Sequence, residues 1–179
     1  MANVLDYIIW RGDIKLSSSK FNELDNIILS RFSYLPFEKI SIKKNDTIES
    51  IAKKFDKVDV EFFNMSDDKR LINEMGKAIR FKDLIVSDYY ALSDYKKEKQ
   101  FIAIIVHLEN GEMYLSYGGT DNTLLGWKED FNLSYMINIP SQIEGVKYIK
   151  KMAKKYTEKI HVGGHSKGGN IAVFSAVFC

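Results

Sequence analysis

The sequence contains one cysteine, two prolines and no apolar run near the ~20 residues that a membrane span needs. Cys179 alone cannot form an internal disulfide, and a single cysteine fits a reducing compartment. Residues 1–10 have no basic region ahead of a long apolar stretch, so they predict no signal peptide. We therefore expect a cytoplasmic protein without a transmembrane segment.

The sequence also lacks a large excess of either charge, because its 26 basic residues are nearly balanced by 24 acidic ones. This balance gives no argument for binding nucleic acid or an anionic membrane surface. Three scattered histidines and one cysteine show no metal-ligand spacing, and the glycines do not fit a phosphate-binding P-loop. The sequence predicts no metal site and no cofactor.

What the chain does have is enough apolar sequence for a core. Apolar residues make up 45% of its 179 residues and aromatic residues 13%, which is a globular composition. We expect a single domain over residues 1–179. Its N-terminal part, residues 1–82, should be helical, and residues 83–179 should form a sheet core.

The most informative stretch runs from Gly164 to Gly168 and spells Gly-His-Ser-Lys-Gly. A short β-type run precedes it and an apolar helical run, residues 171–178, follows it. Strand, sharp turn and helix are the context of a nucleophile elbow, in which Ser166 would be the nucleophile. A plain Gly-Ser loop is the alternative. The elbow explains why both flanking positions are glycine, since larger side chains would collide with the turn.

Residues 167–179 contain no Asp, Glu or His. In α/β-hydrolases the acid and the histidine of the triad follow the serine in chain order. We therefore expect an α/β-hydrolase-like domain that is truncated after the nucleophile helix and inactive by itself. Ending there should leave an exposed apolar surface beside residues 160–163 and 171–178, through which the chain could self-associate.

Apolar periodicity predicts helices at about residues 20–31, 47–55 and 66–79, and Ser141 to Glu144 matches a capping box at the start of a helix over 141–156. In a hydrolase, residues 41–80 could cover the active site, or they could be peripheral helices. The run 101–108 predicts a buried strand, and Asn110-Gly111 predicts a tight primed turn into an antiparallel strand over 112–117.

Strand 112–117, helix 141–156 and strand 160–163 form a β-α-β unit, whose strands should be parallel. The loop at residues 118–122 would then lie beside Ser166 at the carboxyl edge of the sheet. From there it could donate a backbone N–H to an oxyanion, with the N–H of Lys167 as the second donor.

The motifs Tyr117-Gly118-Gly119-Thr120, Trp127-x-x-Asp130 and Gly-His-Ser-Lys-Gly resemble those of class 3 lipases in the α/β-hydrolase superfamily. The chain from about residue 3 to its end is more similar to a bacterial lipase-like family of unknown function, sometimes called Mbeg-like. The resemblance implies Ser166 as nucleophile, Thr120 and Lys167 as oxyanion donors, and Trp127 and Asp130 as supporting residues. Gly118 stands where those lipases have arginine.

Together these features predict an incomplete α/β-hydrolase fold. We expect a mixed, mostly parallel sheet with one antiparallel hairpin, helices on both faces and an N-terminal helical region. The expected function is lipase- or esterase-like hydrolysis of a small-molecule or lipid ester through a serine nucleophile. A non-catalytic hydrolase-like module for binding or assembly is the alternative. The ammonium of Lys167 would either favour anionic acyl or head groups or simply be solvated.

Overall fold

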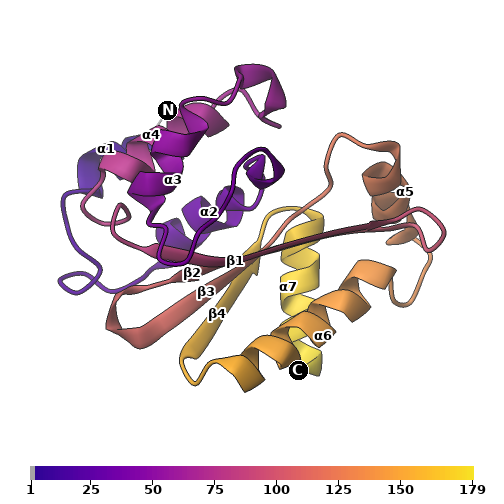
Figure 1. Cartoon of the computed structure of the whole chain (residues 1–179). Helices are drawn as coiled ribbons and strands as arrows, with labels where there is room; N and C mark the ends of the chain where they lie inside the picture. The colour runs from indigo at the N-terminus through magenta and orange to yellow at the C-terminus, as the bar shows by residue number, and fades with distance from the viewer. Residues whose placement is uncertain (1–2) are drawn as a thin grey trace.

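A mixed sheet of four strands separates two groups of helices in the computed structural model, which describes residues 3–179 (Figure 1). The strands are β1 (Ile85–Asp94), β2 (Lys99–His107), β3 (Glu112–Tyr117) and β4 (Lys159–Gly164), in the spatial order β1-β2-β3-β4. Seven α-helices accompany them over these residues. The chain is thus a mixed α/β protein with helices on both faces of its sheet, as the sequence predicts.

The sheet is less parallel than the sequence analysis expects, and that prediction is wrong. β1 pairs with β2 and β2 with β3 in antiparallel fashion, and only β3 and β4 are parallel. The reason is connection length, because a parallel pair needs a crossover of a dozen or more residues. Short turns join β1 to β2 and β2 to β3, so both pairs must be hairpins. Asn110 and Gly111 adopt φ angles of 75° and 70°, as a primed turn requires.

The N-terminal helices cover one face of the sheet (Figure 1). They are α1 (Val4–Arg11), α2 (Glu23–Phe32), α3 (Ile48–Phe55) and α4 (Asp68–Lys77). Thr47 is the N-cap of α3, and its hydroxyl accepts from the Ser50 N–H. Their apolar faces pack on Ile104 and Val106 of β2. The main side chains of this core are Ile28, Phe32, Phe37, Ile51, Phe55, Ile104, Val106 and Tyr114.

Helices α6 (Pro140–Lys155) and α7 (Lys167–Phe178) cover the opposite face, where Ala103 and Ile105 of β2 are buried with them. The predicted capping box on Ser141 is wrong by two residues. Pro140 occupies the first helical position, which needs no N–H donor, and Gln142 accepts from the N–H of Ile139. The β-α-β unit formed by β3, α6 and β4 is confirmed, with Tyr117 level with Gly164 at its carboxyl edge.

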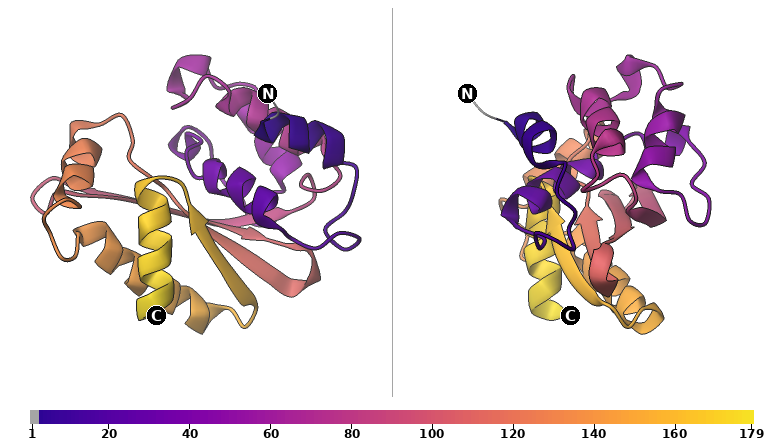
Figure 2. Two further views of the ribbon diagram at one scale, coloured as in Figure 1. Left: turned by 180° about the vertical axis from the view of Figure 1, so that it is seen from behind. Right: turned by 90° about the vertical axis from the view of Figure 1, so that its left-hand side faces the viewer.

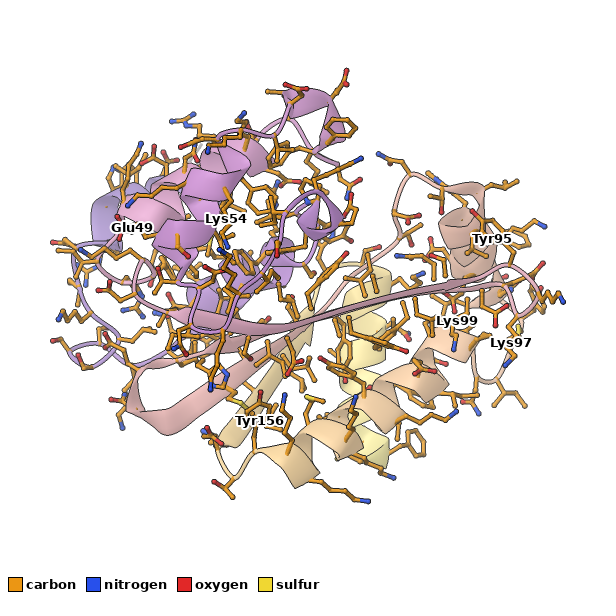
Figure 3. The ribbon with its side chains drawn as sticks, in the orientation of Figure 1. Glu49, Lys54, Tyr95, Lys97, Lys99 and Tyr156 are labelled. Atoms are coloured by element: carbon orange, nitrogen blue, oxygen red, sulfur yellow. The ribbon has the colours of Figure 1, made fainter. Side chains whose placement is uncertain are left out.

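A helix that the sequence analysis does not predict, α5 (Leu124–Asn132), lies beyond the carboxyl edge of β3. The β1–β2 hairpin extends to meet it, and Tyr95, Lys97 and Lys99 mark the end of that hairpin (Figure 3). Residue Thr123 caps the helix by accepting from the Gly126 N–H. This contact places α5 next to the loop that follows β3.

The apolar surface expected beside β4 and α7 is present. Val173, Val177 and Phe178 are more than half exposed on α7, which lies alongside the edge strand β4 (Figure 2). Self-association through this surface stays a prediction. Across residues 3–179, no helix combines the length and the apolar character needed to traverse a bilayer.

Candidate functional site

The strand–turn–helix geometry predicted around Ser166 is present at the junction of β4 and α7. β4 ends at Gly164, α7 begins at Lys167, and exposed Ser166 between them has φ 58° and ψ −127°. A residue with a side chain rarely occupies this region, and doing so costs on the order of 1–3 kcal/mol. The carbonyl of Ser166 accepts the N–H groups of Gly169 and Asn170, which fixes the turn against the helix.

Both elbow glycines are required by close backbone contacts. A Cβ atom at Gly164 would lie 2.5 Å from the carbonyl oxygen of Gly168. One at Gly168 would lie 2.2 Å from the carbonyl oxygen of Tyr117. No side chain fits at such distances, so the elbow can form its tight turn and contact the end of β3 only with glycine at both positions.

The loop that follows β3 contacts the elbow, as expected from the parallel pairing. A Cβ at Gly119 would lie 2.6 Å from the carbonyl oxygen of His165. The next residue, Thr120, has a buried Oγ1 with no hydrogen-bond partner among residues 3–179. Buried hydroxyl groups are normally satisfied, so this one is an exception within a loop that contacts the elbow. The structure therefore brings the two predicted oxyanion loops together.

None of the three histidines is hydrogen bonded to Ser166 within the described residues. The ring of His165 packs against Tyr34, whose hydroxyl lies 3.2 Å from its Nδ1. His161 contacts Glu112 at 2.9 Å, and the Nε2 of His107 lies 2.8 Å from a serine hydroxyl of β1. Each imidazole has another partner, so the structure places no general base on Ser166.

Tyr34 cannot replace the missing base near neutral pH. Burial, with a further contribution from the charges of Asp130 and Asp68, raises the pKa of Tyr34 to about 12. Its hydroxyl therefore keeps its proton and can donate to the carbonyl of His165 at 3.2 Å. Tyr34 holds the loop of the elbow rather than activating the serine.

Lys167 differs from both sequence-based expectations for its side chain. The side chain is completely buried, and Nζ donates to Glu129 Oε2 at 2.9 Å and to Gln100 Oε1 at 2.7 Å. The ammonium group is neither solvated nor directed at a substrate. It anchors the first residue of α7, whose backbone N–H is the expected oxyanion donor, to β2 and α5.

Glu129 is the supporting residue that the sequence analysis misses. Beyond Lys167, its carboxylate accepts the N–H of Gln100 at 2.9 Å and the N–H of Ser141 at 2.8 Å. This one buried side chain thus joins β2, α5, α6 and α7. Its sequence neighbours are charged, and no local pattern marks one carboxylate of such a run as buried.

The two residues expected to give this support do not. The side chain of Trp127 is 63% exposed. Asp130 makes no side-chain hydrogen bond within residues 3–179, although its charge acts on Tyr34. Both lie on α5 beside Glu129, so the motif identifies the right helix but the wrong side chains.

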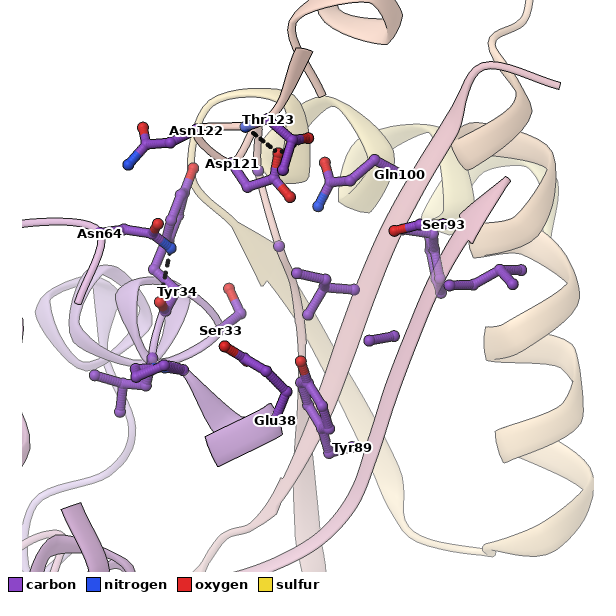
Figure 4. A pocket seen from close by; sticks show the side chains of 18 of the residues that line it. Ser33, Tyr34, Glu38, Asn64, Tyr89, Ser93, Gln100, Asp121, Asn122 and Thr123 are labelled. Carbon is purple, nitrogen blue, oxygen red and sulfur yellow. Dashed lines mark hydrogen bonds between the residues drawn. The ribbon is translucent and has the colours of Figure 1, made fainter. Parts of the chain in front are cut away.

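A cleft of about 400 Å³ lies beside the loop that follows β3 (Figure 4). Its wall includes Gly118 and Gly119 of the oxyanion loop, and Tyr34 and Gln100 face it from opposite sides. Phe62 and Asn64 also line it, so part of region 41–80 borders the cleft while α3 and α4 pack elsewhere. No group of three or more His, Cys, Asp or Glu side chains over residues 3–179 is placed to hold a metal ion.

Residues 75–179, which include the whole sheet, the cleft-forming β3 loop and the elbow, match the protein family described as Mbeg1-like. No curated protein and no solved structure matches the chain.

Proposed function

The chain belongs to the Mbeg1-like family, and on that premise we propose that it is a serine hydrolase of the α/β-hydrolase type that cleaves esters. The observation that carries this proposal is the backbone of Ser166, at φ 58° and ψ −127° between β4 and α7. A strained conformation is retained where the surrounding structure requires it, and such conformations cluster at functional sites. Here the strain exposes the hydroxyl group of one serine.

In the proposed reaction, Ser166 Oγ attacks the ester carbonyl as its proton passes to a histidine base. The negative charge that develops on the carbonyl oxygen is stabilised by the N–H groups of Thr120 and Lys167. The alcohol leaves with the proton from the base, and water then hydrolyses the acyl-serine ester. The unpartnered Oγ1 of Thr120 supports this assignment, since it offers a further donor at the same loop.

We propose that the base is not one of the three histidines of residues 1–179. Each of them has another hydrogen-bond partner. The triad histidine and its acid would come from additional residues or from another chain. Residues 1–179 alone would then retain only the contribution of the oxyanion hole and of binding, which is roughly 10³–10⁴-fold over water in serine proteases.

Hydrolysis of p-nitrophenyl butyrate by the 179-residue chain and by the protein isolated from its native cells tests these points. We expect slow turnover by the chain, which Ser166→Ala should leave largely unchanged because the oxyanion hole and binding remain. The native protein should turn over faster, and Ser166→Ala should abolish that gain. Ser134→Ala, which alters another exposed serine, is the matched control and should have no effect. Equal rates for Ser166→Ala and the unaltered native protein would refute a nucleophilic role and favour a binding module. Rapid turnover by the chain alone would refute the external base.

A further inference from the structure

We propose that Gln100 is a substrate-binding residue, whose Nε2 donates to an oxygen atom of a polar, uncharged ester held in the cleft. This inference extends the proposed function by naming its substrate class. It rests on the proposed function only in taking the ligand to be an ester, because binding in the cleft is tested without turnover.

The orientation of the Gln100 amide is fixed by Lys167. An ammonium group can only donate, so the atom that lies 2.7 Å from Nζ must be the carbonyl oxygen Oε1. The backbone of Gln100 is also held, since its N–H donates to Glu129 and its carbonyl accepts from Nζ at 3.1 Å. The amide nitrogen must therefore point the other way, which is toward the cleft (Figure 4).

Nε2 of Gln100 is buried and has no hydrogen-bond partner within residues 3–179, although the whole residue is only 1% exposed. Leaving a buried donor unsatisfied costs on the order of 1–3 kcal/mol. Native proteins contain few buried donors without a partner, and a ligand bound in the cleft would explain why Gln100 has one. A carbonyl, ether or hydroxyl oxygen of the ligand would satisfy it.

The remaining lining of the cleft selects against a negative charge. Two carboxylates, of Glu38 and Asp121, border it, and none of its lining residues is Lys, Arg or His. Burial, together with the negative charge of Glu38, raises the pKa of Tyr89 to about 12. The charge of Glu38 therefore acts on groups that line the cleft. An anionic acyl or head group would be repelled.

The other side chains around the cleft are of two kinds, which together suit a neutral ligand with both a hydroxylated part and a short alkyl part. Those with hydroxyl or amide groups are Ser33, Tyr34, Asn64, Tyr89, Ser93, Asn122 and Thr123, and the apolar ones are Leu35, Pro36, Phe62, Ala91, Leu92, Phe101 and Ile102. At about 400 Å³ the cleft is within the range of small-molecule sites. The substrate class is therefore a short ester with a neutral, hydroxyl-bearing alcohol or acyl part.

The test uses Ser166→Ala, so that no ester is consumed and the result holds whether or not Ser166 is catalytic. Three probes of similar size are titrated: glyceryl monobutyrate, which is neutral and hydroxylated, butyl butyrate, which is apolar, and monobutyl succinate, which is anionic. The readout is the ¹H–¹⁵N signal of the Gln100 side-chain amide. We expect glyceryl monobutyrate to shift this signal saturably and to bind at least about tenfold more tightly than the other two.

Two variants at the same position test the hydrogen bond itself. Gln100→Glu keeps an acceptor for Lys167 but replaces the donor, and Gln100→Met removes both groups. Each should weaken binding of glyceryl monobutyrate about tenfold, the effect of one lost hydrogen bond of roughly 1.4 kcal/mol. Gln142→Glu is the matched control, because Gln142 lies on α6 outside the cleft lining. It should not alter the affinity.

The proposal is overturned if no probe moves the Gln100 amide signal at millimolar concentration. Equal or tighter binding of butyl butyrate or of monobutyl succinate also overturns it, and so does unchanged affinity in Gln100→Met. Loss of ester turnover in Ser166→Ala bears only on the proposed function.

Discussion

Replacement of Lys167 by methionine should be among the most destabilising single changes in this protein. The side chains of Lys167 and of its partner Glu129 are both 0% exposed. Methionine fills much of the same volume but leaves the Glu129 carboxylate buried with only two N–H donors, from Gln100 and Ser141. Removing one partner of a buried ion pair costs about 3–5 kcal/mol. A protein of this size should lose roughly 6–20 °C in Tm, at about 2–4 °C per kcal/mol.

Urea unfolding followed by far-ultraviolet circular dichroism measures this loss. Lys150→Met, at an exposed lysine of α6, is the control and should change the free energy of unfolding by less than about 0.5 kcal/mol. The double variant Lys167→Met/Glu129→Gln should be more stable than Lys167→Met, because it removes the uncompensated charge. A loss below about 0.5 kcal/mol for Lys167→Met, or a double variant less stable than that single variant, would refute the reasoning.

Other consequences follow from the backbone and from one half-buried histidine, His107. Gly168→Ala should lower the free energy of unfolding in urea by more than about 2 kcal/mol, because its Cβ would lie 2.2 Å from the Tyr117 carbonyl oxygen. Gly169→Ala, whose Cβ would have its nearest contact at 3.0 Å, should lower it clearly less. Ser166→Gly should raise the free energy of unfolding by about 1 kcal/mol. Glycine relieves a backbone strain of roughly 1–3 kcal/mol, which outweighs the smaller entropy cost that its flexibility adds through the unfolded chain. A less stable Ser166→Gly variant would show that the elbow is unstrained. Burial lowers the pKa of His107, so the unfolded chain takes up this proton first as the pH falls below about 6.5. Stability should therefore decrease between pH 7 and pH 5 by more than in His107→Gln, and identical urea midpoints across this range in both proteins would contradict the assignment.

Much of the elbow could be predicted from short-range sequence. Gly164 and Gly168 flank Ser166 in a strand-to-helix context, and such a turn tolerates no side chain at either position. Asn110-Gly111 likewise specifies its turn, because few residue pairs accept two positive φ angles. These features depend on local sterics, which neighbouring residues in the chain determine.

The proportion of parallel pairing was predicted less well, although the evidence was present in the sequence. The charged segment between β1 and β2 is only a few residues long, and a turn of that length between two strands makes a hairpin. Only the β3–β4 connection is long enough for a crossover. The error came from transferring the mostly parallel sheet of the resembled family to this chain, when its own short loops require antiparallel pairs.

By itself, the sequence determined most of the helices and strands, the elbow with Ser166 and the parallel β3–β4 unit that places two loops at one edge. The tertiary structure alone decided which charged side chains are buried. Lys167 is internal because Glu129 and Gln100, from α5 and β2, supply its acceptors, and the burial of an ion depends on partners distant in sequence. For the same reason, neither the unpartnered amide of Gln100 nor the cleft beside it could be recognised before the fold brought these elements together.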